Sequence, residues 1–137
     1  MSDPVNHLLC YGTLMRGECN HARFCANALT IEPAVIAGKL YHLPMGFPAM
    51  VEADDGEVFG EAMTFPDLDA TLREIDRLEG FWPDDPDGSV YLRTVRPVRL
   101  LRSGETVPAY CYLWNRPLPP NAALIPGGRW RGPFCRR

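Results

Sequence analysis

The apolar residues of the chain fall into short runs that glycines and prolines separate. Fourteen prolines and twelve glycines in 137 residues favour strands and turns over long helices. The pattern predicts strands over six ranges, which are His7–Tyr11, Val35–Leu43, Ala49–Glu52, Glu57–Phe65, Tyr91–Leu101 and Val107–Trp114. The last strand is apolar or aromatic on both faces, so we expect it to lie in the centre of a sheet.

Three residues within these ranges should disturb regular strand pairing. Gly38 interrupts the second range. Gly60, in the fourth range, predicts a bulge or a close approach of two backbones. Pro97 lies where the apolar register of the fifth range changes, which indicates a bulge or an edge position.

One segment has the spacing of a helix. Leu68, Leu72 and Ile75 recur at intervals of three or four residues. Asp67 is a start signal for this helix, and Gly80 is placed to end it. Several strands with one main helix predict a single α+β domain over residues 1–137, built on a curled sheet or a small barrel.

The composition is ordinary for a globular domain and argues against several classes of protein. Hydrophobic residues make up 46% of the chain and charged residues 23%. No apolar run approaches the roughly 20 residues that span a bilayer. The first residues lack the basic segment of a secretory signal, so we expect a cytoplasmic protein with no membrane partner. The formal charge of −3 argues against nucleic acid as a partner, and a monomer is compatible with the size.

Metal and disulfide chemistry are both poorly supported by the sequence. The cysteines are odd in number and include no CxxC pair; they are Cys10, Cys19, Cys25, Cys111 and Cys135. The histidines are scattered without the spacing of metal ligands. We therefore predict free thiols, some of them buried, and no metal site.

The first segment that could carry chemistry is Tyr11–Gly17. Gly12 directly follows a predicted buried strand, which lets the chain turn sharply and leaves successive backbone N–H groups pointing outward. Such a loop suits a carboxylate or another anion, although an ordinary glycine turn would have the same sequence. The glycine spacing of a phosphate-binding loop is missing.

The second segment is the end of the predicted helix. Glu79 lies where the helix dipole disfavours a negative charge, and Phe81 and Trp82 follow closely enough to exclude water from it. Both effects would raise the pKa of Glu79, as is required of a carboxylate that accepts and returns a proton near neutral pH. The alternative is a solvent-exposed glutamate beside a helix cap.

A second carboxylate belongs to the same helix. Asp76 lies three residues before Glu79, so the two could share a helix face as the paired carboxylates of a hydrolase. Arg73 and Arg77 are equally well placed to neutralise Asp76, and we favour this structural ion pair. The acidic segment 82–89 fits no EF-hand spacing, and we expect it to be a solvated loop.

Seven short motifs follow one another along nearly the whole chain. They are Tyr11-Gly12-Thr13-Leu14, Arg16-Gly17 with Asn20-His21, Gly56-Glu57-Val58-Phe59-Gly60-Glu61, Ile75-Asp76-Arg77-Leu78-Glu79-Gly80, Tyr91-x-Arg93, Ala109-Tyr110-Cys111-Tyr112 and Gly128-Arg129-Trp130. In this order they resemble the motifs of the γ-glutamylcyclotransferase superfamily, in its AIG2-like or γ-glutamylamine cyclotransferase branch. Each motif is weak alone, and the combination carries the resemblance.

The resemblance implies a fold and a reaction. The fold is a small mixed β-barrel with flanking helices, which agrees with the α+β interpretation. The reaction is the cyclisation of a γ-glutamyl amine or γ-glutamyl amino acid to 5-oxoproline, with release of the free amine. An enzyme of this acyltransferase or lyase type takes a small γ-glutamyl molecule as its partner. It requires no metal and no cofactor, because the α-amine of the substrate is the nucleophile.

The resemblance also implies roles for particular residues. Glu79 matches the family's catalytic glutamate, which acts as general acid/base. The substrate-binding residues are those of the first loop, together with a tyrosine hydroxyl that lines the pocket; they are Tyr11, Gly12, Thr13, Leu14 and Tyr112, with Tyr91 as the less favoured source of the hydroxyl.

Two features depart from the family pattern. The loop after Glu79 is long and acidic, and the proline-rich segment 117–126 could either cover the site or pack on the surface. The main alternative function is a catalytically silent module on the same fold that binds a small carboxylate. The sequence does not identify the leaving amine.

Overall fold

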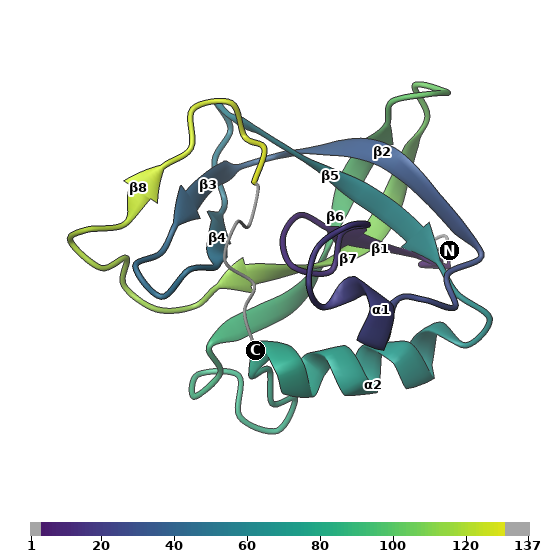
Figure 1. Ribbon diagram of the computed structural model, residues 1–137, viewed down its shortest axis with the longest axis horizontal. Coiled ribbons are helices and arrows are strands. Elements are labelled where there is room, and N and C mark those ends of the chain that lie inside the picture. Colours follow the sequence, from purple (N-terminus) through teal and green to yellow (C-terminus); the bar gives the residue numbers. More distant parts are fainter. Residues whose placement is uncertain (1–3, 131–137) are drawn as a thin grey trace.

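The computed structural model describes residues 4–130, which form two sheets and two helices (Figure 1). The strands are β1 (His7–Cys10), β2 (Thr30–Ala37), β3 (Lys39–His42), β4 (Pro48–Val51), β5 (Glu57–Thr64), β6 (Tyr91–Leu100), β7 (Thr106–Trp114) and β8 (Ala123–Leu124). The helices are α1 (His21–Phe24) and α2 (Leu68–Glu79).

Five strands close into a barrel in the order β1-β5-β2-β6-β7. β1 pairs antiparallel with β5 and parallel with β7, which makes the barrel mixed. Strands β4, β3 and β8 form a smaller sheet beside it, and α2 runs along the barrel with α1 next to it (Figure 1). Buried apolar side chains such as Leu8, Val58 and Met63 form the hydrophobic core. The predicted α+β barrel with flanking helices is confirmed.

The strand candidate over 35–43 is broken at Gly38, as the sequence indicates, and the break separates two sheets. Its residues belong to β2 and β3, which lie in different sheets, and Gly38 stands at the corner between them. A Cβ atom on Gly38 would lie 3.0 Å from the carbonyl oxygen of Val51, so the corner is tight for any other residue. β2 begins at Thr30, earlier than expected. The apolar pattern does not mark its first half, because that half contains polar residues and Pro33. The short elements α1 and β8 were not predicted.

Gly60 and Pro97, which were also expected to disturb regular strand pairing, lie where the sequence indicates a close approach and an edge. A Cβ atom on Gly60 would meet the carbonyl oxygen of Cys10, so the predicted close approach of β5 and β1 is confirmed. Pro97 pairs with Pro108 in an uninterrupted register between β6 and β7. On the other side of β6, pairing with β2 is recorded only at Arg99 and Leu100 among residues 4–130. Pro97 therefore occupies an edge position rather than a bulge.

Helix α2 begins and ends as predicted. The side chain of Asp67 accepts a hydrogen bond from the Ala70 N–H at 3.1 Å and caps the first turn. Gly80 ends the helix with a left-handed φ of 69°. Leu72 and Ile75 face the core, so the helix is fixed against the barrel and its last residue, Glu79, has a defined position.

The chain after β7 packs on the smaller sheet. β8 pairs with β3, and the Ile125 N–H donates to the Leu40 carbonyl at 2.8 Å. Trp130 is buried, and its indole N–H lies 3.2 Å from Nδ1 of His42. Of the two alternatives for segment 117–126, the structure shows surface packing. In the part of the chain that is described, no helix is long and apolar enough to cross a membrane.

The cysteines follow the sequence prediction in part. Three of them, Cys10, Cys25 and Cys111, are buried free thiols, as predicted. Cys19 is disulfide-bonded, so the prediction of a free thiol is wrong there. Cys135 lies outside the described residues. The odd number of cysteines and the lack of a CxxC motif therefore did not exclude a disulfide.

Candidate active site

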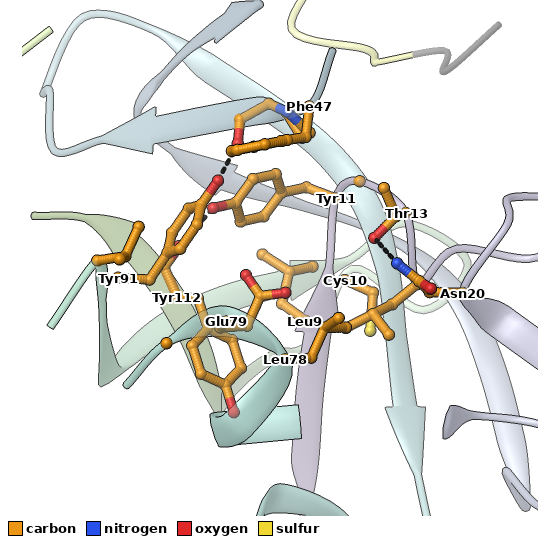
Figure 2. Close-up of a pocket in the computed structure, with 15 residues that line it drawn as sticks. Leu9, Cys10, Tyr11, Thr13, Asn20, Phe47, Leu78, Glu79, Tyr91 and Tyr112 are labelled. Carbon is orange, nitrogen blue, oxygen red and sulfur yellow. Dashed lines mark hydrogen bonds between the residues drawn. The ribbon is translucent and has the colours of Figure 1, made fainter. Parts of the chain in front are cut away.

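A cavity of about 300 Å³ lies between the loop after β1, the end of α2 and the first residues of β4 and β6 (Figure 2). It brings together every site residue predicted from the sequence, which are Tyr11, Gly12, Thr13, Leu14, Glu79 and Tyr112. Segments far apart in the chain therefore meet at one place. This volume is at the lower end of the range for small-molecule sites.

Of the described residues that line the cavity, Glu79 is the one that carries a charge. Figure 2 shows its carboxylate pointing into the cavity, towards the rings of Tyr11 and Tyr91. Within residues 4–130 its side chain makes no recorded hydrogen bond or ion pair, in spite of partial burial. Burial, and then the negative charge of Asp76, raise the pKa of Glu79 to about 7.

The direction of this pKa change agrees with the sequence analysis, but the residues that exclude water are different. Phe81 and Trp82 do not line the cavity. Trp82 is 47% exposed. The side chains around Glu79 are instead Leu78 from its own helix, with Tyr11 and Tyr91 from the barrel. The contacts with Tyr11 and Tyr91 are not local in sequence, and only the family resemblance indicated that these residues share a site with Glu79.

The loop after β1 turns against β4 and presents backbone donors. A Cβ atom on Gly12 would lie 2.6 Å from Cγ of Pro48, so the close packing admits only glycine. The Asn20 side chain donates to the Thr13 hydroxyl at 2.9 Å, and the Asn20 backbone N–H donates to the Thr13 carbonyl at 2.9 Å. Within the described chain, no hydrogen bond is recorded from the N–H groups of Gly12, Thr13 and Leu14. Three successive donors are therefore available to an anion.

Two tyrosines form a wall of the cavity, and both have fixed hydroxyl groups. The Tyr11 hydroxyl donates to the carbonyl of Tyr112, and the Tyr91 hydroxyl donates to the carbonyl of Pro48 at 2.6 Å. Burial raises the pKa of both phenols. They stay protonated near neutral pH, and their oxygens can only accept a further hydrogen bond.

The third tyrosine connects the cavity to Asp76. Tyr112 lines the cavity (Figure 2). Its hydroxyl donates to Asp76 at 2.7 Å. Arg93 on β6 pairs with the same carboxylate at 2.9 Å. The predicted ion pair of Asp76 therefore exists with a different partner, because Arg73 and Arg77 are exposed on the outer face of α2. Asp76 does not line the cavity, which removes the condition that a paired-carboxylate hydrolase requires.

Several cavity residues were not predicted as part of a site. They are Leu9, Cys10, Asn20, Phe47, Pro48, Leu78, Gly80 and Val90. Asn20, Leu78 and Gly80 carried a signal, as parts of family-like motifs. The others are apolar residues on separate elements, which have nothing in their local sequence that distinguishes them from core residues.

The acidic segment 82–89 stands beside the cavity and does not line it. Ser89 is buried and bonds to both Trp82 and Asp85, and Arg116 donates to the carbonyls of Asp87 and Gly88. These bonds hold the backbone and leave the aspartates exposed to solvent, as predicted. Among the described residues, no group of three or more His, Cys, Asp or Glu is arranged to hold a metal ion.

Comparison with known proteins identifies relatives of this chain. The sequence profile of the family described as gamma-glutamyl cyclotransferase, AIG2-like, matches residues 8–132. The chain is 31% identical over 110 residues to the gamma-L-glutamyl-butirosin B gamma-glutamyl cyclotransferase of Niallia circulans, which covers 80% of this chain and 67% of that protein.

Solved structures share the fold. An AIG2-like protein from Mus musculus superposes with a TM-score of 0.65 at 23% identity, over 98% of this chain and all (100%) of that one. YkqA from Bacillus subtilis gives 0.67 at 24% identity, over 91% of this chain. The chain spans only 39% of YkqA. Because these sequence identities are low, the structural similarity shows a shared barrel fold and no more.

Proposed function

Because the chain belongs to the AIG2-like γ-glutamyl cyclotransferase family, we propose that it cyclises a small γ-glutamyl amine or γ-glutamyl amino acid to 5-oxoproline and releases the free amine. The relative from Niallia circulans is named for this reaction on γ-glutamyl butirosin B. The observation that carries the proposal is the carboxylate of Glu79, which lies in the cavity with a raised pKa and without a partner among the described residues.

Glu79 supplies the proton transfers. The substrate α-amine enters as an ammonium group, and Glu79 accepts a proton from it. The neutral amine attacks the γ-carbonyl carbon, the C–N bond of the ring forms, and the carbonyl electrons move to the oxygen. Glu79 then returns this proton to the departing nitrogen as the original C–N bond breaks and the oxyanion electrons re-form the carbonyl. The ring nitrogen loses its second proton through the same carboxylate to the released amine, which leaves as an ammonium group. A pKa of about 7 suits both directions of transfer near neutral pH.

The loop after β1 can stabilise negative charge on the substrate. The free N–H groups of Gly12, Thr13 and Leu14 can hold the substrate carboxylate or the oxyanion that develops on the γ-carbonyl oxygen. Neither role requires a nucleophile from the protein, because amine and carbonyl belong to one molecule. Holding these two groups in the ring-closing pose supplies much of the rate.

The test is release of 5-oxoproline from a panel of γ-glutamyl amines, γ-glutamyl dipeptides and glutathione. We expect release by the wild type and its loss in Glu79→Gln. Glu74→Gln is the matched control, because Glu74 is an exposed glutamate on the same helix. Binding of a γ-glutamyl ligand without turnover of any panel member would contradict the proposal and indicate a silent binding module.

A second variant tests the loop. Gly12→Ala places a methyl group against the ring of Pro48, so the loop must move away from β4. We expect kcat/KM to fall by about tenfold or more, because a displacement of about 1 Å in a positioning group can cost 100-fold. Gly127→Ala is the control, since its added Cβ meets no atom within 4 Å. Unchanged kinetics in Gly12→Ala would separate the loop from the substrate.

A further inference from the structure

Arg93 lies outside the cavity, yet it contacts residues on both sides of Glu79. Its Nη1 is 2.9 Å from Oδ2 and 3.2 Å from Oδ1 of Asp76, three residues before Glu79. Its guanidinium carbon is 5.5 Å from the centre of the Phe81 ring, two residues after Glu79. One side chain on β6 therefore joins the two ends of the segment that carries the reactive carboxylate.

The same two residues are the ends of the helix cap. The Phe81 N–H donates to the Asp76 carbonyl at 2.8 Å, and the Gly80 N–H donates to the Arg77 carbonyl at 3.3 Å. In caps with this bonding pattern, the residues at the positions of Asp76 and Phe81 frequently make an apolar contact across the turn. Asp76 cannot make such a contact. Arg93 replaces it, because its guanidinium pairs with the carboxylate and faces the ring.

This bridge is anchored in the barrel. Arg93 is paired in register with Tyr112 on β7, whose hydroxyl donates to Asp76 at 2.7 Å. The guanidinium carbon also lies 5.3 Å from the centre of the Tyr110 ring. The side chain of Asp76 is 8% exposed and that of Arg93 24%, so water screens the pair only in part.

We propose that Arg93 is a positioning residue for Glu79: it fixes the last turn of α2 against the barrel and partly offsets the charge of Asp76 beside the reactive carboxylate. Only the kinetic readout of this inference rests on the proposed function. The direction of the Glu79 carboxylate and the local charge are properties of the folded protein without substrate.

Asp76 is the charged group that acts directly on the titration of Glu79, and Arg93 is paired with Asp76. The other titratable groups that interact with Glu79 are Cys10, Tyr11, Tyr91 and Tyr112. The hydrogen bond with Cys25 and burial raise the pKa of Cys10, and burial raises the pKa of the three tyrosines. All four remain neutral while Glu79 titrates near pH 7.

The first test is a direct titration of the Glu79 side-chain carboxyl carbon by NMR, without substrate. In Arg93→Met the charge of Asp76 is no longer partly offset, so we expect the pKa of Glu79 to rise by roughly half a pH unit or more. In Asp76→Asn the anion is removed, so the pKa of Glu79 should fall. The double variant lacks both charges, so its Glu79 pKa should lie between those of the two single variants. A merely structural contact predicts a fall in both single variants, because a loosened turn admits water to Glu79.

The second test separates position from charge. Arg93→Lys keeps the positive charge but lacks the flat, forked group that pairs with Asp76 and faces two rings. We expect the pKa of Glu79 to stay near the wild-type value, kcat to fall about tenfold, and KM to change less than about twofold. Arg96→Lys is the control, since Arg96 lies on the same strand and pairs with Glu52 away from the cavity.

The outcomes remain distinct from those of the proposed function. An unchanged or lowered pKa of Glu79 in Arg93→Met, or full kcat in Arg93→Lys, would overturn the inference. Absence of 5-oxoproline release by the wild type would instead contradict the proposed function. In that case the NMR titrations still decide whether Arg93 partly offsets the charge of Asp76 next to Glu79.

Discussion

The last turn of α2 carries two carboxylates in opposite environments, one on each side of the helix. On the side that faces β6 and β7, Asp76 accepts hydrogen bonds from Arg93 and Tyr112 and is almost fully buried. On the side that faces the cavity, Glu79 has no recorded partner among the described residues, and burial raises its pKa. One carboxylate stabilises the attachment of the helix. The other lowers the stability of the fold at neutral pH and is available for proton transfer.

The largest expected effect that separates the two sides is on turnover. Among residues 4–130, Glu79 is the only residue with a carboxylate that lines the cavity, so kcat of Glu79→Gln should fall about 10³-fold. Asp76→Asn keeps the size of the side chain and its ability to accept from Tyr112, so kcat should fall less than about tenfold. The measurement is steady-state 5-oxoproline release. Equal losses in the two variants would restore a paired-carboxylate mechanism.

The next effect is on stability, and it falls on the other side of the turn. Asp76→Ala leaves Arg93 and the Tyr112 hydroxyl without their shared acceptor. We expect the free energy of unfolding to fall by about 2 kcal/mol, since Arg93 is partly exposed and water replaces some of the lost contact. Urea denaturation at pH 8 measures this change. A loss below about 0.5 kcal/mol would mean that the pair adds little to the attachment of α2.

Glu79→Gln should change stability in the opposite direction. The folded pKa of Glu79 is about 7, above the ordinary value of 4.5, so the folded state binds its proton more tightly than the unfolded state. This contribution is complete below pH 4.5 and is lost as the pH rises through 7. We therefore expect Glu79→Gln to be more stable than the wild type by about 1–2 kcal/mol at pH 8.

The same denaturation series at pH 4 is the control for that prediction. There the carboxyl group is largely protonated in both states, so Glu79→Gln and the wild type should have nearly equal free energies of unfolding. A stabilisation that does not depend on pH would contradict a raised pKa at Glu79 and would indicate an effect of the amide itself.

The smallest effect is expected in the acidic segment directly after the turn. Asp84 and Asp87 are exposed, and the segment is held through backbone carbonyls and Ser89 rather than through these carboxylates. Asp84→Asn and Asp87→Asn should change kcat/KM by less than about twofold. A tenfold loss for a cationic substrate, with no loss for a neutral one, would show that the segment attracts the leaving group.

Local signals explain what could be predicted from the sequence. Asp67 and Gly80 define both ends of α2 through hydrogen bonds and a backbone angle that involve only near neighbours. The position of Glu79 one residue before Gly80 follows from this cap. The Gly12 turn is local in the same way, although its contact with Pro48 is not.

The remaining features depend on contacts between distant segments. Arg93 pairs with Asp76 because β6 passes the last turn of α2, and nothing near either residue in the sequence marks the other. The division of 35–43 between two sheets depends on closure of the barrel, which apolar periodicity does not report. Leu78 and Val90 at the rim of the cavity are 39% and 37% exposed. Their role in the site can be recognised only after the distant segments have come together.

The most direct test of the central claim is the pH dependence of kcat/KM for 5-oxoproline release. Glu79 must be ionised to accept a proton from the substrate amine, so activity should fall about tenfold per pH unit below the pKa of Glu79. We expect this acidic limb to have its midpoint at about pH 7. An acidic limb near 4.5, the ordinary value for a glutamate, would contradict a buried, unpaired Glu79 as the acid/base.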